Sequence, residues 1–182
     1  RHIFVERLAD ADESADSARQ TERVFAVLGN KLSAFNATIA QNVLRTWLYV
    51  PHIDADYPGV VRARKKLFDS INLTEDTHYI ASTGIQGGTG DRFARVAMDA
   101  YAVTGIDEKN VRYIQAPDYL SPTHVYGVTF ERATAIEMGN TDFLFISGTA
   151  SIDNKGEIVH PGDVVKQTER TLTNISALLD AA

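Results

Sequence analysis

The tetrapeptide Gln20-Thr21-Glu22-Arg23 occurs a second time as Gln167-Thr168-Glu169-Arg170, close to the last residue of the chain. Each copy begins an apolar pattern with the period of an amphipathic helix. The apolar positions are Val24, Phe25, Val27, Leu28, Leu32 and Phe35 in the first pattern, and Leu172, Ile175, Leu178 and Leu179 in the second. Internal similarity over a distance the size of a small domain indicates two related domains rather than a solenoid. Since only a short tail comes after the second copy, we expect the chain to be a piece of a longer tandem protein.

The composition narrows the class of protein. The chain has 182 residues, of which 44% are hydrophobic, and this is enough to bury a core in one domain or slightly more. Its net charge of −6 argues against broad electrostatic binding to nucleic acid. The absence of cysteine excludes disulfides and cysteine-ligated metals and fits a cytoplasmic protein. No apolar run approaches the ~18 residues of a membrane span. The five histidines lack ligand spacing, so we expect neither a metal nor another cofactor.

Hydrophobic periodicity predicts strands and helices in alternation through the first part of the chain. We expect strands at 3–8, 44–50, 77–83 and 95–103, and helices at 19–40 and from a first turn that holds Pro58. The segment 95–103 is rich in alanine and also fits a helix. The basic residues Arg62, Arg64, Lys65 and Lys66 fit either a local basic patch or a solvated helix face, and we expect the solvated face. This order predicts an α+β fold with a mixed sheet packed against helices on one side.

The second part of the chain begins after a natural linker at Pro117 to Pro122. We expect a strand at 124–132 that places Tyr126 and Arg132 on one face, a buried strand at 142–147, and a hairpin at 151–159. A final helix is expected to begin near Asp163. The glycine-rich segment 84–90 lacks the Gly-Lys-Ser/Thr ending of a phosphate loop and is interpreted as a mobile connection or a ligand-facing loop. Residues 153–157 lack the spacing of a calcium loop and are interpreted as a turn.

One stretch combines a buried strand with a chemically useful end. The apolar strand at 142–147 leads into small and hydroxyl residues, among them Ser147, Gly148 and Thr149. Backbone N–H groups and hydroxyls at such a position suit an oxyanion or a carboxylate. Close packing between neighbouring elements explains the small residues equally well. Arg132, on an otherwise apolar face with Tyr126, needs either a structural carboxylate or a bound anion.

Several of these segments resemble the Rid (YjgF) family. Residues 142–148, the adjoining hairpin, and Gln167, Asn174 and Leu178-Leu179 resemble the first half of a Rid domain, while 45–83 resembles the second half. The combination of 45–50, 81–85, 121–128 and 147–153 is similar to the tandem branch that includes the chorismatases. The resemblance implies a Rid/YjgF-like (chorismate mutase-like) fold. In that layout 1–112 is the latter part of a first domain, 113–123 a linker, and 124–182 the first half of an incomplete second domain.

The same resemblance implies a function and a site. Rid proteins are usually trimers with ligand sites between subunits, and known members hydrolyse enamines and imines. For this chain the resemblance implies a small carboxylate ligand and the hydrolysis of an enol ether or an imine. The substrate-binding residues that it implies are Tyr126, Arg132, Ser147, Gly148 and Thr149, and the catalytic residues are unknown. No arginine lies at 77–83, where the deaminating members hold the substrate, so we expect no deaminase chemistry there and an inactive chain on its own.

Two alternatives to an enzyme of this kind stay open from the sequence. One is a non-catalytic metabolite-binding or regulatory module, matching the "translation initiation inhibitor" label of some family members. The other is the endoribonuclease activity assigned to others, which the acidic charge disfavours. A half-domain also leaves sheet edges unpaired, so we expect a homo-oligomer.

Overall fold

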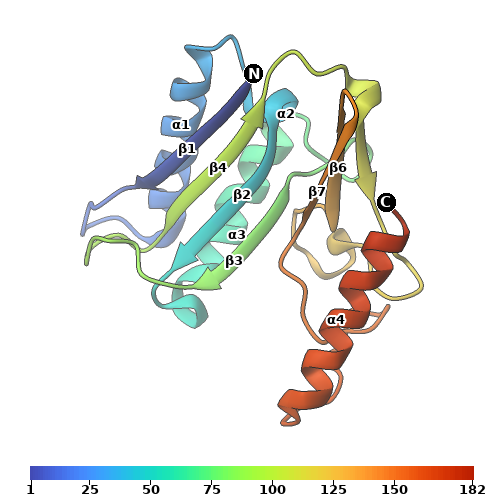
Figure 1. Cartoon of the computed structure of the whole chain (residues 1–182). Helices are drawn as coiled ribbons and strands as arrows, with labels where there is room; N and C mark the ends of the chain where they lie inside the picture. The colour runs from blue at the N-terminus through green and yellow to red at the C-terminus, as the bar shows by residue number, and fades with distance from the viewer.

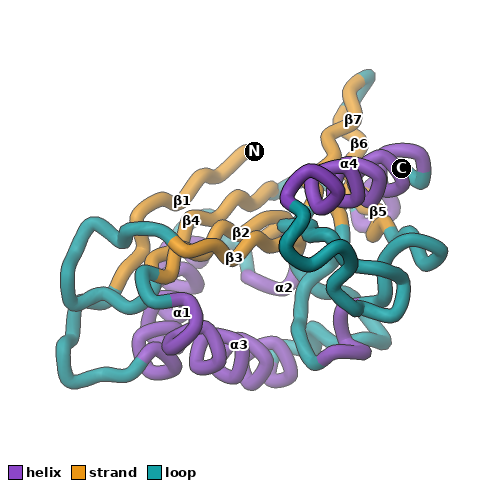
Figure 2. The backbone as a smooth tube through the Cα atoms, turned by 90° about the horizontal axis from the view of Figure 1, so that it is seen from below, coloured by secondary structure: helices purple, strands orange, loops and turns teal.

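A four-stranded mixed sheet covered by helices on one face forms the first half of the chain (Figures 1 and 2). The computed structural model describes all 182 residues except the side chain of Tyr126. The strands have the order β1-β4-β2-β3. The elements of this half are β1 (His2–Ala9), α1 (Ser17–Ser33), α2 (Ile39–Asn42), β2 (Val43–Val50), α3 (Ile53–Ser70), β3 (Ala81–Gln86) and β4 (Ala97–Val103). The expected α+β architecture is confirmed.

The register of the sheet reflects its connections. β2 and β3 are parallel, with Arg45 opposite Ala81, because α3 carries the chain back across the sheet. β4 is antiparallel to both β1 and β2. α1 and α3 bury their apolar sides on the sheet, where Phe25 of α1 and Phe68 of α3 meet at a ring distance of 6.0 Å. This leaves the opposite face of β2 and β4 free to meet other elements.

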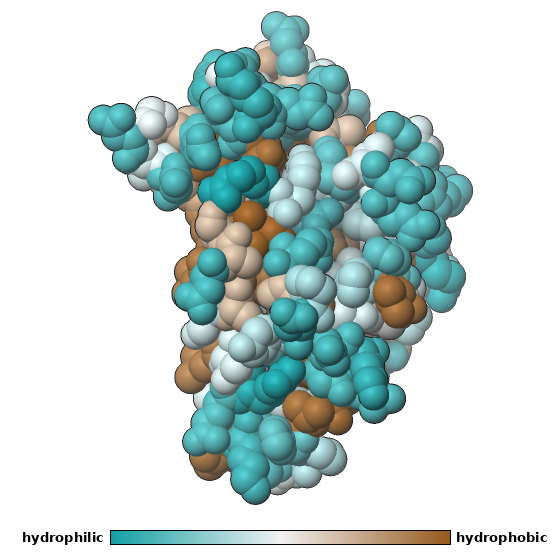
Figure 3. Space-filling view, turned by 90° about the vertical axis from the view of Figure 1, so that its right-hand side faces the viewer, coloured by the Kyte–Doolittle hydropathy of each residue, from teal (hydrophilic) through white to brown (hydrophobic). Residues whose placement is uncertain are grey.

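A three-stranded antiparallel sheet with the order β5-β6-β7 forms the second half. Its elements are η1 (Glu108–Asn110), β5 (Val111–Ile114), η2 (Thr123–Tyr126), β6 (Ala133–Met138), β7 (Thr141–Ile146) and α4 (Val164–Asp180). α4 buries Leu178 against this sheet, whereas Val164, Leu172 and Leu179 are exposed on its outer side. Figure 3 shows this side of the molecule as largely hydrophilic with separate hydrophobic patches. β5 crosses the domain boundary expected at residue 112.

The two sheets join at β3. Ala81 forms a parallel bridge with Glu131, whose backbone N–H donates to the carbonyl of Ile80 at 3.2 Å. The backbone N–H of Gly148, just beyond β7, donates to the carbonyl of Ser82 at 3.2 Å. β3 therefore lies between β2 on one side and residues of the second half on the other (Figure 1).

The strand expected at 124–132 is wrong. Residues 123–126 form the short helix η2, which ends at Gly127 in the left-handed region with φ of 81°. The Thr123 hydroxyl then donates to the carbonyl of Phe130 at 2.6 Å and holds this segment as a compact loop. The residue types alternate as in a strand, but local hydrogen bonds and a left-handed glycine prevent the extended backbone that a strand needs.

Other boundaries also differ from the expectation. The helix expected at 19–40 ends at Ser33, and Asn36 with φ of 53° turns the chain before α2 begins. The strand expected at 77–83 begins only at Ala81. α3 begins at Ile53, so Pro58 lies inside the helix; Asp54 and Asp56 in the first turn favour this earlier start through the helix dipole. The strands at 44–50, 95–103 and 142–147 are confirmed to within about two residues at each end.

The repeated tetrapeptide lies near the start of a helix in both halves. An aspartate caps each helix: Asp16 accepts from the Arg19 N–H in α1, and Asp163 accepts from the Lys166 N–H in α4. Gln20 of the first copy is fully buried, whereas Gln167 of the second is half-exposed. The two helices therefore have different surroundings. Among the described residues, no helix has the length and apolar character that a membrane crossing requires.

A pair of glycine substitutions tests the packing of α1 on α3. A Cβ at Gly59 would lie 2.2 Å from the Ser17 hydroxyl oxygen and 3.0 Å from the Ala18 backbone nitrogen, so Gly59→Ala should lower the free energy of unfolding by about 1–3 kcal/mol. At Gly29 the nearest atom would be 3.8 Å away, so Gly29→Ala should raise it by roughly 0.5–1 kcal/mol. Urea unfolding of both variants measures the difference, and equal effects would contradict the packing described.

Candidate functional site

Arg45 lies on β2, on the sheet face that does not carry α1 and α3. Its neighbour Leu48 belongs to the helix-covered core, whereas Trp47 packs toward the second sheet. Side chains alternate along a strand, so Arg45 and Trp47 share the second face. The Arg45 guanidinium carbon lies 4.9 Å from the Trp47 ring centre, a cation–π contact.

The Arg45 guanidinium is buried without an acidic partner. Arg45 is only 5% exposed, and its Nη2 donates to the hydroxyl of Thr83 on β3. Within the part of the chain that the structure describes, its Nη1 has no hydrogen-bond partner and no carboxylate forms an ion pair with it. Burial lowers its pKa to about 10, so the group still carries its charge at neutral pH. A buried cation of this kind is costly unless an anion approaches it.

The segment Ser147-Gly148-Thr149 passes directly beside this arginine. A Cβ placed on Gly148 would lie 3.0 Å from Cγ2 of Thr83, the residue that accepts the Arg45 hydrogen bond. Only a glycine lets the backbone approach Thr83 this closely without a shift of its neighbours. Gly148 is exposed, and Thr83, Trp47 and Thr149 are half-buried. Arg45 therefore contacts Thr83 close to the point where the exposed Gly148 of the second half meets β3.

Three of the expected ligand donors are used within the chain. The Ser147 hydroxyl accepts from the Ser82 N–H at 2.8 Å and donates to the Glu131 carbonyl at 2.5 Å. The Gly148 N–H is bonded to the Ser82 carbonyl. The Thr149 hydroxyl donates to the Ser147 carbonyl at 3.0 Å. These contacts hold the segment in place against β3.

The Arg132 backbone carbonyl accepts from the Ser147 N–H at 2.9 Å, but the Arg132 side chain makes its hydrogen bonds elsewhere. Arg132 is 2% exposed, and its Nε and Nη2 donate to the carbonyl of Ser121 at 3.1 and 2.6 Å. Its guanidinium also lies 5.5 Å from the ring centre of Phe130. The side chain of Tyr126, also expected at the site, lies outside the described residues. The arginine in contact with Thr83 beside Gly148 is thus Arg45, which the sequence reasoning missed.

A second buried arginine, Arg64 of α3, approaches β3 from the helix side. It is 1% exposed and donates from Nε to the Thr129 hydroxyl at 3.2 Å and from Nη1 to the Ser82 hydroxyl at 3.3 Å. Burial lowers its pKa. The assignment of Arg64 to a solvated basic face is wrong. Arg64 lies one helical turn from Val60 and one from Phe68, so it shares the buried side of α3 with them. Lys65 and Lys66 are exposed as expected.

Glu131 is a buried carboxylate at the join between the sheets. It accepts from the Tyr79 N–H at 2.8 Å and from the Gln115 side-chain amide at 2.7 Å. Burial raises its pKa, and these hydrogen bonds oppose the rise in part. The folded protein therefore holds a proton at Glu131 more readily than the unfolded chain does.

The stability that Glu131 contributes should depend on pH. Since its pKa is raised in the folded state, the contribution is fully present below the usual value of 4.5 and is lost as pH rises through the folded pKa. Relative to Glu131→Gln, the wild-type protein should lose stability as pH is raised from about 4 to 8. Urea unfolding of both proteins over this range measures the difference, and a pH-independent difference would contradict the assignment.

The fold and the site define an α+β protein with two sheets and a buried arginine near the join between them. No protein-family model matches the chain. The 3-hydroxybenzoate synthase of Streptomyces hygroscopicus is 29% identical over 149 residues, which cover 76% of this chain and 43% of that protein. A RutC family protein of Pyrococcus horikoshii is 55% identical over 49 residues, 26% of this chain and 36% of that protein.

A crystal structure of a chorismatase superposes on this chain with a TM-score of 0.72 and 25% sequence identity, and the match covers 97% of this chain and 53% of that chain. The chain therefore spans about half, or less, of the length of these relatives. Together the matches confirm the resemblance stated from the sequence: the chain is related to the chorismatase-like branch of the Rid/YjgF superfamily.

Proposed function

We propose that this chain binds a small carboxylate metabolite at the join between its two sheets, as part of a chorismatase-like protein. The observation that carries this proposal is Arg45, a buried guanidinium whose Nη1 has no partner among the described residues. A carboxylate at Nη1 would neutralise the buried charge and satisfy the nitrogen in one contact. The half-buried Trp47 ring lies against the Arg45 guanidinium, and the exposed Gly148 lies close to Thr83, so a carboxylate at Nη1 would lie near both.

In this proposal the residues expected from the sequence border the ligand or hold neighbouring segments in position. Ser147, Gly148 and Thr149 form the edge that borders the ligand, and their internal hydrogen bonds keep that edge rigid. Arg132 fixes the segment at Ser121 that precedes η2, where Tyr126 is found. In the whole protein an acid would protonate an enol ether or imine of the bound molecule and water would complete the hydrolysis. No residue of this chain is assigned as that acid.

A second candidate function is a binding or regulatory module without chemistry. The observation in its favour is that no described carboxylate pairs with Arg45, and that the Ser147 hydroxyl is already engaged on both sides. A group that is held in this way has no free proton to transfer. Both candidates share the carboxylate at Arg45 and differ only in whether the bound molecule is hydrolysed.

The proposal extends to assembly. Phe4 of β1 and Phe143 of β7 are 67% and 40% exposed, and both belong to an aromatic group centred on Tyr101 that includes His2. A second copy of the chain would cover these rings, as in a trimer with ligand sites between subunits. A cytoplasmic location fits this proposal.

Two measurements test the function, the first on the purified chain and the second on the whole protein. Calorimetric titration with 3-hydroxybenzoate, the product in the name of the Streptomyces relative, should give saturable binding with one site per chain. Incubation of the whole protein with chorismate and subsequent chromatography then separate the two candidates: pyruvate release supports the enzyme, and binding without turnover supports the binding module. Absence of saturable binding by either compound would overturn the proposal.

A further inference from the structure

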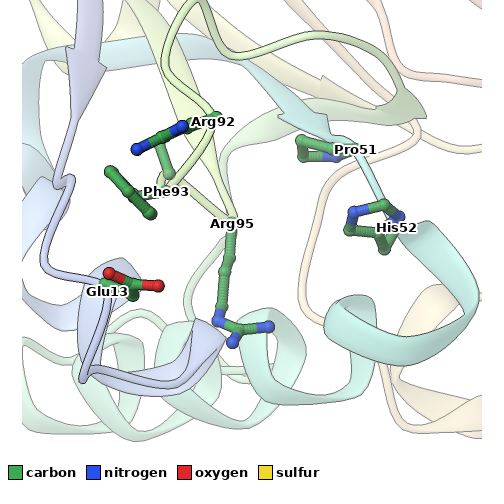
Figure 4. Close-up of a pocket in the computed structure, with 7 residues that line it drawn as sticks. Glu13, Pro51, His52, Arg92, Phe93 and Arg95 are labelled. Carbon is green, nitrogen blue, oxygen red and sulfur yellow. The ribbon is translucent and has the colours of Figure 1, made fainter.

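A separate cavity of about 540 Å³ lies at the end of β2 opposite to Arg45. It is found where β2 passes into α3, beside the loop that leads into β4 and the segment that precedes α1 (Figure 4). The side chains around it are Glu13, Pro51, His52, Arg92, Phe93 and Arg95. Its volume is within the range of roughly 300–1,000 Å³ that small-molecule sites have.

The buried Gln20 side chain holds the backbone of the loop that carries Arg92, Phe93 and Arg95. The fully buried Gln20 side chain donates to the Phe93 carbonyl at 3.0 Å and accepts from the Arg95 N–H at 2.7 Å. The Asp91 carboxylate accepts from the Phe93 N–H at 2.8 Å. The first copy of the repeated tetrapeptide thus fixes this loop before any ligand arrives, which lowers the cost of binding.

The side chains that line the cavity carry charges of both signs. The Arg95 guanidinium is already paired with Asp56 at 3.3 Å. Arg92 lies 4.4 Å over the Phe93 ring, and the described residues provide no carboxylate partner for it. Glu13 has no cationic partner in the described part of the chain either. Figure 4 shows the Phe93 ring between Arg92 and Glu13. One cation, one anion and an aromatic ring therefore remain to meet a ligand.

We propose that this cavity binds a zwitterionic α-amino acid with a large apolar or aromatic side chain. The carboxylate contacts Arg92, the ammonium group contacts Glu13, and the side chain lies against Phe93 and Pro51. A simple anion would meet the charge of Glu13, and a simple cation would meet that of Arg92, so both are disfavoured. This site is distinct from Arg45 and does not depend on the function proposed there.

Titration of the wild-type chain with L-phenylalanine as the probe tests the proposal. Saturable binding is expected, and 3-phenylpropionate, which lacks the amine, and phenethylamine, which lacks the carboxylate, should each bind roughly tenfold more weakly or worse. Equal binding of either analogue, or no saturable binding of L-phenylalanine at millimolar concentration, would overturn the assignment.

Matched variants locate the site. Arg92→Gln and Glu13→Gln change exposed side chains and should keep the fold while weakening L-phenylalanine binding by roughly tenfold each. Arg62→Gln changes an arginine of α3 outside the cavity and should leave binding unchanged. Arg45→Met should also leave it unchanged, which separates this site from the one at the sheet join. Unaltered binding in Arg92→Gln would contradict the proposal.

Discussion

Replacing Arg64 by alanine is expected to lower the free energy of unfolding by about 3–5 kcal/mol. The side chain fills space in the core between α3 and β3 and donates to the hydroxyls of Ser82 and Thr129. Alanine would leave a cavity and two buried hydroxyls with one partner fewer. Because Thr129 belongs to the second half of the chain, the join between the sheets should weaken as well. Urea or thermal unfolding measures the change.

Arg64→Met separates charge from volume at the same position. Methionine fills most of the space and removes a buried charge whose Nη2 has no hydrogen-bond partner among the described residues. Arg64→Met should therefore lower the free energy of unfolding by less than half as much as Arg64→Ala does. Arg62→Ala, on the more exposed side of α3, should change the free energy of unfolding by no more than about 0.5 kcal/mol. Equal losses for Arg64→Met and Arg64→Ala would contradict the idea that an unsatisfied charge lies there.

Arg45→Met should weaken 3-hydroxybenzoate binding by roughly ten- to a hundredfold while the stability of the free protein stays the same or rises by about 1 kcal/mol. Methionine can keep the contact with the Trp47 ring, and it removes a buried cation that has no acidic partner among the described residues. Loss of binding without loss of stability is the mark of a ligand-binding arginine. Replacement of a purely structural arginine would instead lower the stability and leave the binding unchanged.

Arg62→Met is the matched control, since it replaces an arginine of α3 that lies away from the join. Its binding and its stability should both resemble those of the wild-type chain. Calorimetry and urea unfolding of the three proteins give the comparison. A destabilised Arg45→Met variant that still binds 3-hydroxybenzoate would contradict the account.

Much of the fold could be predicted because several segments have an unambiguous local pattern. The strand at 44–50 is rich in β-branched and aromatic residues, and the two helices that begin near the repeated tetrapeptide have a clear apolar period. β6, by contrast, contains alanines and a threonine, and its burial depends on Leu120 and Leu178 from other parts of the chain as well as on its neighbour β7. The segment 124–132 alternates like a strand, yet Gly127 and the Thr123 hydroxyl turn it into a loop.

The site was harder to predict because Arg45 and Arg132 are both buried, and only their contacts in the folded chain show which one lies beside Thr83. Arg132 and Arg45 both interrupt apolar strand patterns, and the sequence reasoning applied the question of a partner only to Arg132. The same question at Arg45, the single charge between Val43 and Val50, was the available signal. The approach of Gly148 to Thr83 could not be inferred from the sequence, because it depends on how the second sheet joins β3.

A crystal structure of the chain with 3-hydroxybenzoate tests the central claim most directly. We predict that the carboxylate lies within about 3 Å of Nη1 of Arg45, beside the Gly148 backbone and next to the Trp47 ring. The claim would be contradicted by a carboxylate bound elsewhere on the chain, or by an Arg45 side chain whose Nη1 is already satisfied by an acidic residue of the protein itself.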